Sequence, residues 1–496
     1  MSAGAGRARQ TTRQTTGRRQ PRGARTRPTR LADPPPAHLQ GVPVTVSRDV
    51  LEAVVKAYDV RGIVGEQLDA EFARAFGAAT ANVLLPDGGT MVVGYDMRPS
   101  SPGLAHAFAD GANARGIDVV DIGLASTDQL YFASGVLDAA GAMFTASHNP
   151  AGYNGIKLCR PGAAPVAIDT GLGAIRDLVP EVDGLPPVES GTRTEQDFTE
   201  RFAAHVRSFV DVNALREVSV VVDAGNGMAG HVWPAAVEGL PIRTTPLYFE
   251  LDGSFPNHPA NPLEPENLRD LQAAVRAGDH ALGLAFDGDA DRVFAVDEQG
   301  RPVSSSLIGA VVADRLLTRH PGATVLYNLI CSHTVPETIE AAGGIAVRTR
   351  VGHSFIKRRM AETDAVYAVE HSGHYYFRDN YRADSGIIAA LVLLEAVADA
   401  GAPLSEVVAP YDRYAASGEL NHEVADQSAA LDRVAGAFDG RADIDTEDGL
   451  TVVTGDGWFN LRPSNTEPLL RLNVEADDVP LMERLRDEVV ALIAAG

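Results

Sequence analysis

The stretch Met91-Val92-Val93-Gly94-Tyr95-Asp96 decides the fold. It is a short apolar run that closes on a carboxylate, which is typical of a strand followed by a loop. A helical pattern follows near 104–115, and Ile117-Asp118-Val119-Val120 returns as the next strand. This order of elements predicts a βαβ unit.

The same order recurs twice further along the chain. Residues 219–223 read Ser-Val-Val-Val-Asp and precede a glycine-rich loop and a helix. Residues 324–328 read Thr-Val-Leu-Tyr-Asn and precede a helix over 336–342 and a strand over 345–347. We therefore predict three mixed α/β units. Joints between units are predicted where Pro and Gly cluster, around 184–192, 300–302 and 403–410.

The last segment, from Tyr411 to Gly496, reads as strands and helices in smaller pieces and ends in an amphipathic helix over 479–494. At roughly 150 residues per domain, a chain of 496 residues suggests about three or four domains. The predicted fold is α/β, with three related mixed α/β domains and a smaller α+β domain at the C-terminus. The predicted limits are 1–44 for a disordered tail, 45–192, 193–300 and 301–410 for the α/β domains, and 411–496 for the last domain.

Charge divides the chain into two parts. The first 41 residues carry nine Arg and one Asp, a formal charge of +8, so the rest of a chain with net charge −23 carries −31. An acidic body of this kind makes nucleic-acid binding an unfavoured function. The Arg-rich tail has almost no large apolar residues, so we expect it to be disordered and not a secretory signal, although such tails also serve as transit peptides or polyanion-binding arms.

Cysteine usage and hydropathy point to a cytoplasmic protein. Two cysteines, Cys159 and Cys331, allow no disulfide framework to be drawn. No apolar run reaches the roughly 18 residues that cross a bilayer. We expect a soluble protein without a membrane partner.

The first motif with chemical content is Thr145-Ala146-Ser147-His148-Asn149-Pro150, which places a hydroxyl nucleophile on a polar turn after the apolar run 141–144. Such a serine suits phosphate chemistry, although the same residue types also build ordinary turns. A second motif, Asp287-Gly288-Asp289-Ala290-Asp291-Arg292, packs three carboxylates into five residues and adds an arginine. Oxygen ligands favour Mg²⁺ or Ca²⁺. We predict Mg²⁺ beside a phosphate that Arg292 contacts.

Two other interpretations of the acidic loop stay open. Asp287, Asp289, Asp291 and Glu298 fall at positions 1, 3, 5 and 12 of an EF-hand calcium loop. Position 6, which needs glycine, holds Arg292, and the flanks look like strands instead of helices. The loop alone is also compatible with a solvated acidic turn.

Two further loops carry polar groups. Arg462-Pro463-Ser464-Asn465-Thr466-Glu467-Pro468 offers a guanidinium, hydroxyls, an amide and backbone N–H groups that can grip a phosphate. Glu370-His371-Ser372-Gly373-His374 follows the apolar run 365–369 and suits sugar hydroxyls. Each motif in isolation is also compatible with a structural role.

Together these loops resemble the bacterial phosphomannomutases and phosphoglucomutases of the α-D-phosphohexomutase superfamily. The resemblance runs from Thr45 to the C-terminus and includes a fifth motif, Lys-Ala-Tyr-Asp-Val-Arg-Gly, at 56–62. It implies four domains arranged as a heart around one central cleft, with one loop from each domain. It also implies interconversion of hexose 6-phosphate and hexose 1-phosphate, with mannose as the first expected sugar and glucose as the second.

The resemblance implies a role for each loop. Ser147 would carry a phosphoryl group, pass it to the sugar to give a hexose 1,6-bisphosphate, and recover the other phosphate, with the bisphosphate also serving as activator. Mg²⁺ would be held by Ser147, Asp287, Asp289 and Asp291. The other implied catalytic residues are Lys157, His374 and Arg292. The implied substrate-binding residues are Tyr58, Arg61, Thr145, His148, Asn149, Gly352, His353, Glu370, Ser372, Arg462, Ser464, Asn465 and Thr466.

One departure bears on substrate choice. Where some relatives have a lysine, this chain has Ile330, and nearby Arg348, Arg350, His353 and Lys357 are candidates to replace it. The alternatives are a phosphoglucosamine mutase, whose sugar loop usually has Gln where this chain has His371, and a metal-dependent sugar phosphatase. The expected partners are small sugar phosphates, and the expected state is a monomer or homodimer.

Overall fold

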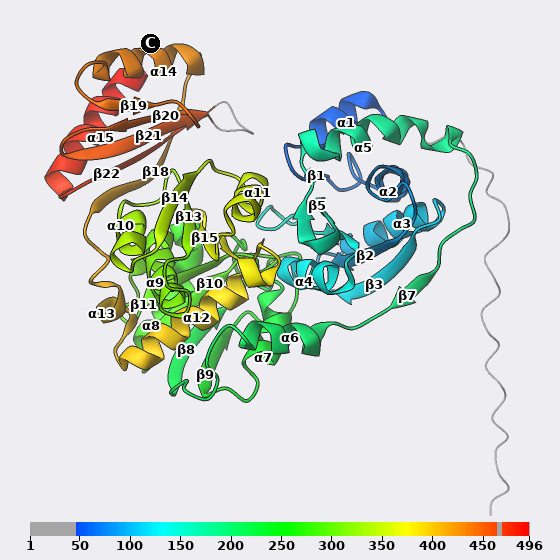
Figure 1. Cartoon of the computed structure of the whole chain (residues 1–496), viewed down its shortest axis with the longest axis horizontal. Helices are drawn as coiled ribbons and strands as arrows, with labels where there is room; N and C mark the ends of the chain where they lie inside the picture. Colours follow the sequence, from blue (N-terminus) through cyan, green and yellow to red (C-terminus); the bar gives the residue numbers. More distant parts are fainter. Residues whose placement is uncertain (1–45, 464–468, 496) are drawn as a thin grey trace, which may run out of the picture. The chain divides into compact units, whose positions relative to one another are not determined.

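The computed structural model describes residues 46–463 and 469–495, so the predicted disordered tail at 1–44 lies outside the described residues. Within them the chain forms four β-sheets with helices packed against them (Figure 1). The first three sheets mix parallel and antiparallel pairs and the fourth is antiparallel, which confirms the predicted fold class. None of the described helices is long and apolar enough to cross a membrane.

The predicted βαβ unit lies at the centre of the first sheet. Strand β2 (Thr90–Tyr95), helix α3 (Ser101–Asn113) and strand β3 (Asp118–Leu124) follow one another, and the strands pair in parallel with Met91 opposite Val119. The sheet order is β1-β5-β4-β2-β3-β7, with β6 beside β5. The other elements are α1 (Arg48–Val54), β1 (Val60–Ile63), α2 (Ala70–Leu84), α4 (Thr127–Leu137), β4 (Ala140–Phe144), β5 (Tyr153–Arg160), β6 (Ala164–Pro165), α5 (Leu172–Leu178) and β7 (Arg193–Glu195).

The second sheet repeats the pattern with the order β12-β11-β10-β8-β9. Its central strand pair is parallel, and β10 turns back antiparallel into β11 through the acidic loop 287–292. The elements are α6 (Thr199–Arg207), β8 (Val218–Asp223), α7 (Ala229–Val237), β9 (Ile242–Leu247), α8 (Arg269–Ala277), β10 (Leu282–Phe286), β11 (Val293–Asp297) and β12 (Pro302–Val303).

The third sheet has the order β14-β13-β15-β16-β17. Strands β13, β14 and β15 are parallel, and the sugar-loop motif 370–374 joins β15 to the antiparallel β16. The elements are α9 (Ser305–Arg319), β13 (Thr324–Asn328), α10 (Thr334–Ala341), β14 (Ile345–Thr349), α11 (His353–Thr363), β15 (Tyr367–Val369), β16 (Tyr375–Phe377), β17 (Ala383–Asp384), α12 (Gly386–Ala400) and α13 (Leu404–Val408).

The fourth sheet is antiparallel, with the order β18-β22-β21-β20-β19. The predicted C-terminal helix is present as α15 (Val479–Ala494), which begins because the Asp478 carboxylate accepts a hydrogen bond from the Leu481 N–H. The other elements are β18 (Ala415–Glu423), α14 (Gln427–Phe438), β19 (Asp443–Asp445), β20 (Leu450–Val453), β21 (Gly457–Pro463) and β22 (Leu469–Ala476).

The predicted domain limits do not coincide with the edges of the sheets. Strand β7 pairs with β3, so the first sheet extends past 192, and β12 pairs with β11, so the second extends past 300. Of the three predicted joints, only 300–302 contains a paired strand residue, Pro302, while β7 begins directly after 184–192 and helix α13 lies within 403–410. The limits stay a proposal.

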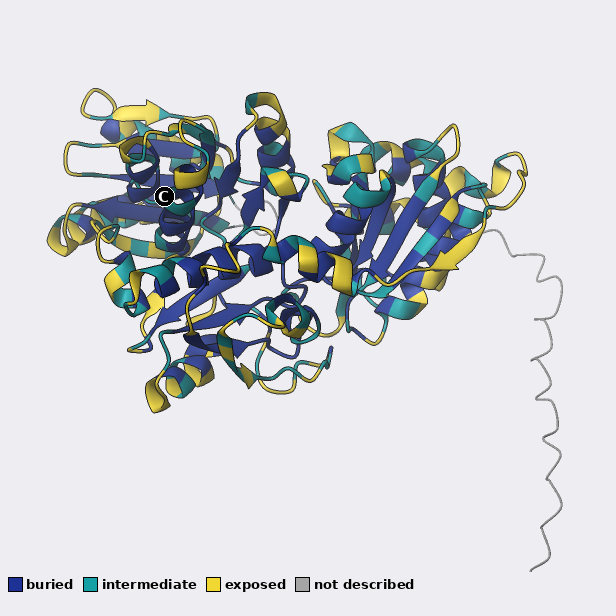
Figure 2. Ribbon diagram, turned by 60° about the horizontal axis from the view of Figure 1, so that its bottom comes forward, coloured by how far each residue is buried: buried dark blue, intermediate teal, exposed yellow. Residues whose placement is uncertain are grey.

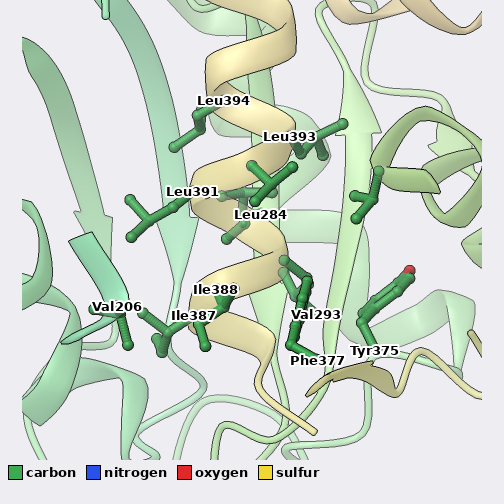
Figure 3. Packing of buried hydrophobic residues seen from close by; sticks show 14 of the residues in the cluster. Val206, Leu284, Val293, Tyr375, Phe377, Ile387, Ile388, Leu391, Leu393 and Leu394 are labelled. Atoms are coloured by element: carbon green, nitrogen blue, oxygen red, sulfur yellow. The ribbon is translucent and has the colours of Figure 1, made fainter. Parts of the chain in front are cut away.

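Helix α12 is buried nearly all round, because it packs against strands of the second sheet and against helices α6, α7, α9 and α13. It begins where Ser385 Oγ accepts from the Ile388 N–H, and it ends at Gly401, whose φ of 61° suits glycine. Its side chains share one apolar cluster with residues of the second and third sheets and of helix α6 (Figure 3): Ile387, Ile388, Leu391, Leu393 and Leu394 with Val206, Leu284, Val293, Tyr375 and Phe377. Figure 2 shows the buried strands as dark blue ribbons beside helices with one exposed face.

Candidate active site

Ser147 lies on the loop between β4 and β5, at the carboxyl end of a parallel strand, where open α/β sheets bind ligands. Its backbone is in the left-handed region, with φ 49°, and its N–H donates to Thr145 Oγ1 at 2.9 Å. Left-handed backbone is strained for any residue with a Cβ, so surrounding contacts must hold it.

The Ser147 hydroxyl is buried and already engaged with the acidic loop. Oγ donates to Asp287 Oδ2 at 2.7 Å and lies 3.2 Å from His148 Nδ1. Burial and the charges of Arg292 and Arg61 lower the pKa of His148 well below its usual range, so its ring is neutral. The two motifs that the sequence singled out therefore meet at one oxygen atom.

The acidic loop is a turn between two antiparallel strands, β10 and β11. This excludes the EF-hand interpretation, which requires flanking helices. The three carboxylates are buried, and one oxygen from each lies within 4.8 Å of the others. A solvated acidic turn is excluded for the same reason, since none of the three is exposed.

Electrostatics show that the carboxylate cluster suits a cation. Burial and the repulsion of Asp291 and Asp289 raise the pKa of Asp287 to about 8. Burial would also raise the pKa of Asp289, but Lys157 and a hydrogen bond from Thr127 lower it. Among the described residues, nothing donates a hydrogen bond to the buried oxygens Asp289 Oδ1 and Asp291 Oδ1. The donor set, all oxygen and partly unpaired, fits a hard divalent ion such as Mg²⁺.

Lys157 supplies positive charge to the same cluster. Its Nζ donates to Asp289 Oδ2 at 2.7 Å and to Asp291 Oδ2 at 2.5 Å. Burial lowers the pKa of Lys157, but the two aspartates outweigh burial and raise it above the usual range. Lys157 is therefore an ammonium in this arrangement.

Gly288 allows the acidic loop to approach the serine loop. A Cβ at this position would lie 2.5 Å from the carbonyl oxygen of Ser147. We expect Gly288→Ala to separate the two loops and to lower kcat by about 100-fold, since a displacement of about 1 Å can cost that much. Steady-state kinetics would check this. Gly103→Ala is the matched control, because a Cβ there meets no atom of the described part of the chain within 4 Å, and it should leave kcat unchanged.

His374 connects the sugar loop to the acidic loop. Its Nε2 accepts from Arg292 Nε at 2.9 Å, and its Nδ1 lies 2.8 Å from Asp384 Oδ2. Nε2 therefore carries a lone pair, and the ring proton is on Nδ1. Burial and Arg292 lower the pKa of His374, but Asp291 and Asp384 outweigh them and raise it.

Glu370 is buried and fixed by two donors. Oε1 accepts from the Gly352 N–H at 3.1 Å, and Oε2 accepts from the Tyr376 hydroxyl at 2.6 Å. Gly352 immediately precedes α11, so Glu370 also fixes the position of His353, whose ring packs edge-on against Tyr58 at 4.5 Å. Tyr58, Gly352, His353 and Glu370 thus form one connected group, although they come from three segments of the chain.

Arg61 joins the serine loop from β1. Its Nη1 donates to the Ala146 carbonyl at 2.8 Å and to Asn149 Oδ1, and its Nε pairs with Asp59 at 2.8 Å. The predicted contact of Arg61 with the reacting group is therefore compatible with its position beside Ser147.

Three of the candidate replacements for the missing lysine at position 330 already have partners in this structure. Arg348 pairs with Asp445 and Glu447, and Arg350 stacks over the Phe355 ring at 4.8 Å. Lys357 lies 3.4 Å from Asp384 and over the Tyr131 ring. Arg462 is buried at the end of β21 beside Glu419, while Ser464, Asn465 and Thr466 lie outside the described residues.

Three buried residues of the site were not found from the sequence. Thr127, at the start of α4, donates to Asp289 Oδ2 at 2.6 Å, Asp384 contacts His374, and Arg98 reaches the backbone of the serine loop. Arg98 was detectable, since it follows the carboxyl end of a predicted strand that ends in Asp96, and such ends face ligand sites. Thr127 and Asp384 carry no comparable signal.

A buried serine hydroxyl beside a carboxylate cluster, a lysine and an arginine defines an α/β enzyme built for phosphoryl transfer. Comparison of the sequence with models of known protein families identifies the family of enzymes. Models of phosphoglucomutase/phosphomannomutase α/β/α domains I, II and III match residues 52–182, 196–300 and 304–414, and the model of the C-terminal domain matches 419–492. The chain belongs to the phosphoglucomutase/phosphomannomutase family. It is an isomerase of the phosphotransferase mutase type.

Individual relatives agree with this assignment. The chain is 41% identical over 445 residues to a Xanthomonas campestris protein described as phosphohexose mutases, with 88% of this chain and 98% of the relative covered. It is 40% identical over 452 residues to a phosphomannomutase of Salmonella montevideo, with the same coverage. A crystal structure of a family protein from Burkholderia thailandensis superposes with a TM-score of 0.81 at 33% identity, covering 90% of this chain and 98% of that one.

Proposed function

We propose that this enzyme interconverts hexose 6-phosphates and hexose 1-phosphates through a phosphoserine at Ser147, with mannose preferred and glucose as a second substrate. The observation that carries the proposal is the 2.7 Å hydrogen bond from Ser147 Oγ to Asp287 in a buried carboxylate cluster. Relatives described as phosphomannomutases at about 40% identity support the sugar.

The carboxylate cluster is proposed to hold Mg²⁺ through Asp287, Asp289, Asp291 and an oxygen of phosphorylated Ser147. When bound, the ion would neutralise charge on the transferring phosphoryl group. Arg292, whose Nε lies 3.6 Å from Asp287 Oδ2, adds a guanidinium on the same side.

Two titratable residues beside the carboxylate cluster, His374 and Lys157, would move the protons. As the bond from phosphorus to Ser147 Oγ breaks, a bond forms to the free hydroxyl oxygen of the sugar. The hydroxyl proton passes to His374 Nε2, whose lone pair becomes free when Arg292 Nε leaves it for the phosphoryl group. Lys157, which is held as an ammonium, returns a proton to Oγ. The bisphosphate then turns over, and the reverse transfer restores both groups. Free hexose 1,6-bisphosphate would activate the enzyme by phosphorylating Ser147.

The remaining residues would position the substrate. Glu370 and Ser372 would accept the 3- and 4-hydroxyls, since a carboxylate oxygen that already accepts one hydrogen bond can accept another. Arg462, with Ser464, Asn465 and Thr466, would hold the distant phosphate in either orientation. The residues proposed near the reacting phosphate or the sugar ring are Tyr58, Arg61, Thr145, His148, Asn149, Gly352 and His353.

We expect mannose 1-phosphate and glucose 1-phosphate, primed with the matching bisphosphate, to give the 6-phosphates without release of inorganic phosphate. Parallel assays with mannose, glucose and glucosamine 1-phosphates would check this, with free phosphate measured in each. Stoichiometric phosphate release would show a phosphatase instead. Preferential turnover of glucosamine 1-phosphate would show a phosphoglucosamine mutase.

A further inference from the structure

Arg98 is fully buried, and all the hydrogen-bond donors of its guanidinium are used. A guanidinium has five N–H groups in a fixed fork. Nε donates to Asp96 Oδ2 at 3.2 Å. The other four N–H groups donate to backbone carbonyl oxygens of the serine loop and of the first residue of β5: Ser147 at 2.9 Å, Asn149 at 2.7 Å, Pro150 at 2.9 Å and Tyr153 at 3.0 Å. The whole turn that carries the nucleophile is therefore gathered around one side chain.

The carbonyl group that Arg98 holds belongs to the strained residue itself. Ser147 has φ 49°, a backbone conformation that surrounding contacts must maintain. The same carbonyl oxygen is the atom that a Cβ at Gly288 would meet. Arg98 thus fixes the one peptide group that sets the distance between the serine loop and the acidic loop.

Arg98 is itself locked from two sides. Asp96 Oδ1 accepts from the Arg98 N–H at 3.0 Å and from Ser101 Oγ at 2.6 Å. On the other side the Phe255 ring, from the second unit, lies 5.1 Å from the guanidinium carbon, and Gly253 packs against the Arg98 Cα. Because residues of both units hold the Arg98 side chain, the position of the serine loop depends on how both units pack around it.

We propose that Arg98 is a positioning residue for phosphoryl transfer, which holds the left-handed turn of Ser147 so that Oγ faces the acidic loop. This inference rests on the proposed function of Ser147. Arg98 touches no reacting atom, since its hydrogen bonds are with the backbone and with Asp96 and its other contact is with the Phe255 ring. Lysine cannot replace it, because an ammonium has three donors on one atom and cannot reach acceptors on both sides of the fork.

Arg98→Lys tests the inference. We expect kcat to fall by about 100-fold while KM changes by less than about threefold, because the nucleophile is displaced and the sugar-binding groups are not. Amide hydrogen exchange over residues 145–153 should accelerate by at least about tenfold, with little change elsewhere. Arg315→Lys is the control, since Arg315 on α9 pairs with Glu395 and Asp399 of α12, outside the site. It should lose stability without loss of kcat.

The outcomes separate the inference from the proposed function. If the native chain transfers no phosphoryl group, the proposed function fails, and the exchange measurement alone then decides whether Arg98 holds the loop. A kcat within about twofold of native, or unchanged exchange over 145–153, would overturn the inference, as would an equal loss of kcat in Arg315→Lys. If Arg98→Lys does not fold, Asp96→Asn keeps the guanidinium but weakens its anchor. It should lower kcat by about tenfold with faster exchange in the same segment, and native values of both would overturn the inference.

Discussion

Ser147→Ala is expected to lower kcat by roughly four orders of magnitude, because the covalent relay loses its carrier and no second hydroxyl takes over. That loss corresponds to about 5.5 kcal/mol of transition-state stabilisation. A coupled assay for hexose 6-phosphate measures it directly. Intact mass spectrometry adds a second reading: incubation with hexose 1,6-bisphosphate should add one phosphoryl group to the native chain and none to the variant.

The matched control for this change is Ser134→Ala. Ser134 is as buried as Ser147, and its hydroxyl donates to the Ala139 carbonyl at 2.7 Å in the body of the first unit. Its loss should cost about 1 kcal/mol of stability and leave kcat unchanged. Near-native turnover in Ser147→Ala would refute the role assigned to the serine.

Removal of divalent cations is expected to have the second largest effect. Treatment with EDTA should lower kcat by at least about a thousandfold, and added Mg²⁺ should restore it, because the buried carboxylates repel one another without a cation. Binding should also appear without turnover. At a Mg²⁺ concentration of about 100 times its Kd, the folded state gains about 2.7 kcal/mol, so the melting temperature should rise.

Asp289→Asn should abolish this thermal shift together with activity. Asp297→Asn is the control. Asp297 is also buried, but it is the last residue of strand β11, at the end away from the acidic loop, and it pairs with Arg301. Full activity after exhaustive chelation, or a Mg²⁺ shift that survives in Asp289→Asn, would contradict the assignment of the cluster.

The elements of the fold were predictable because they rest on local signals. An apolar run such as 91–96 has few alternatives to a buried strand, and the C-terminal helix is set by its apolar periodicity and by Asp478 at its start. The ends of the sheets were not predictable in the same way. Strands β7 and β12 are short, and only their partners across the sheet hold them in place, so composition suggested linkers.

The site was predictable where its residues share one loop. The three aspartates lie within five residues, so their chemistry is visible as a unit. Thr127 and Asp384 join the same site from positions about 160 and 90 residues away from those aspartates, and only tertiary packing brings them there. The ion pairs of Arg348 could not be read from the chain either, since its partner Asp445 belongs to another sheet.

Helix α12 has a consequence for how this chain can be divided. The apolar side chains of α12 belong to the same cluster as Leu284 and Val293. A fragment that ends before residue 386 would therefore leave Leu284 and Val293 exposed to water. A fragment that begins at residue 386 would expose the apolar side chains of α12. Neither piece would be an autonomous folding unit, so evolution or an engineer could exchange these two middle modules only together. The terminal module, whose apolar cluster draws on its own strands and helices alone, is the part that could be grafted.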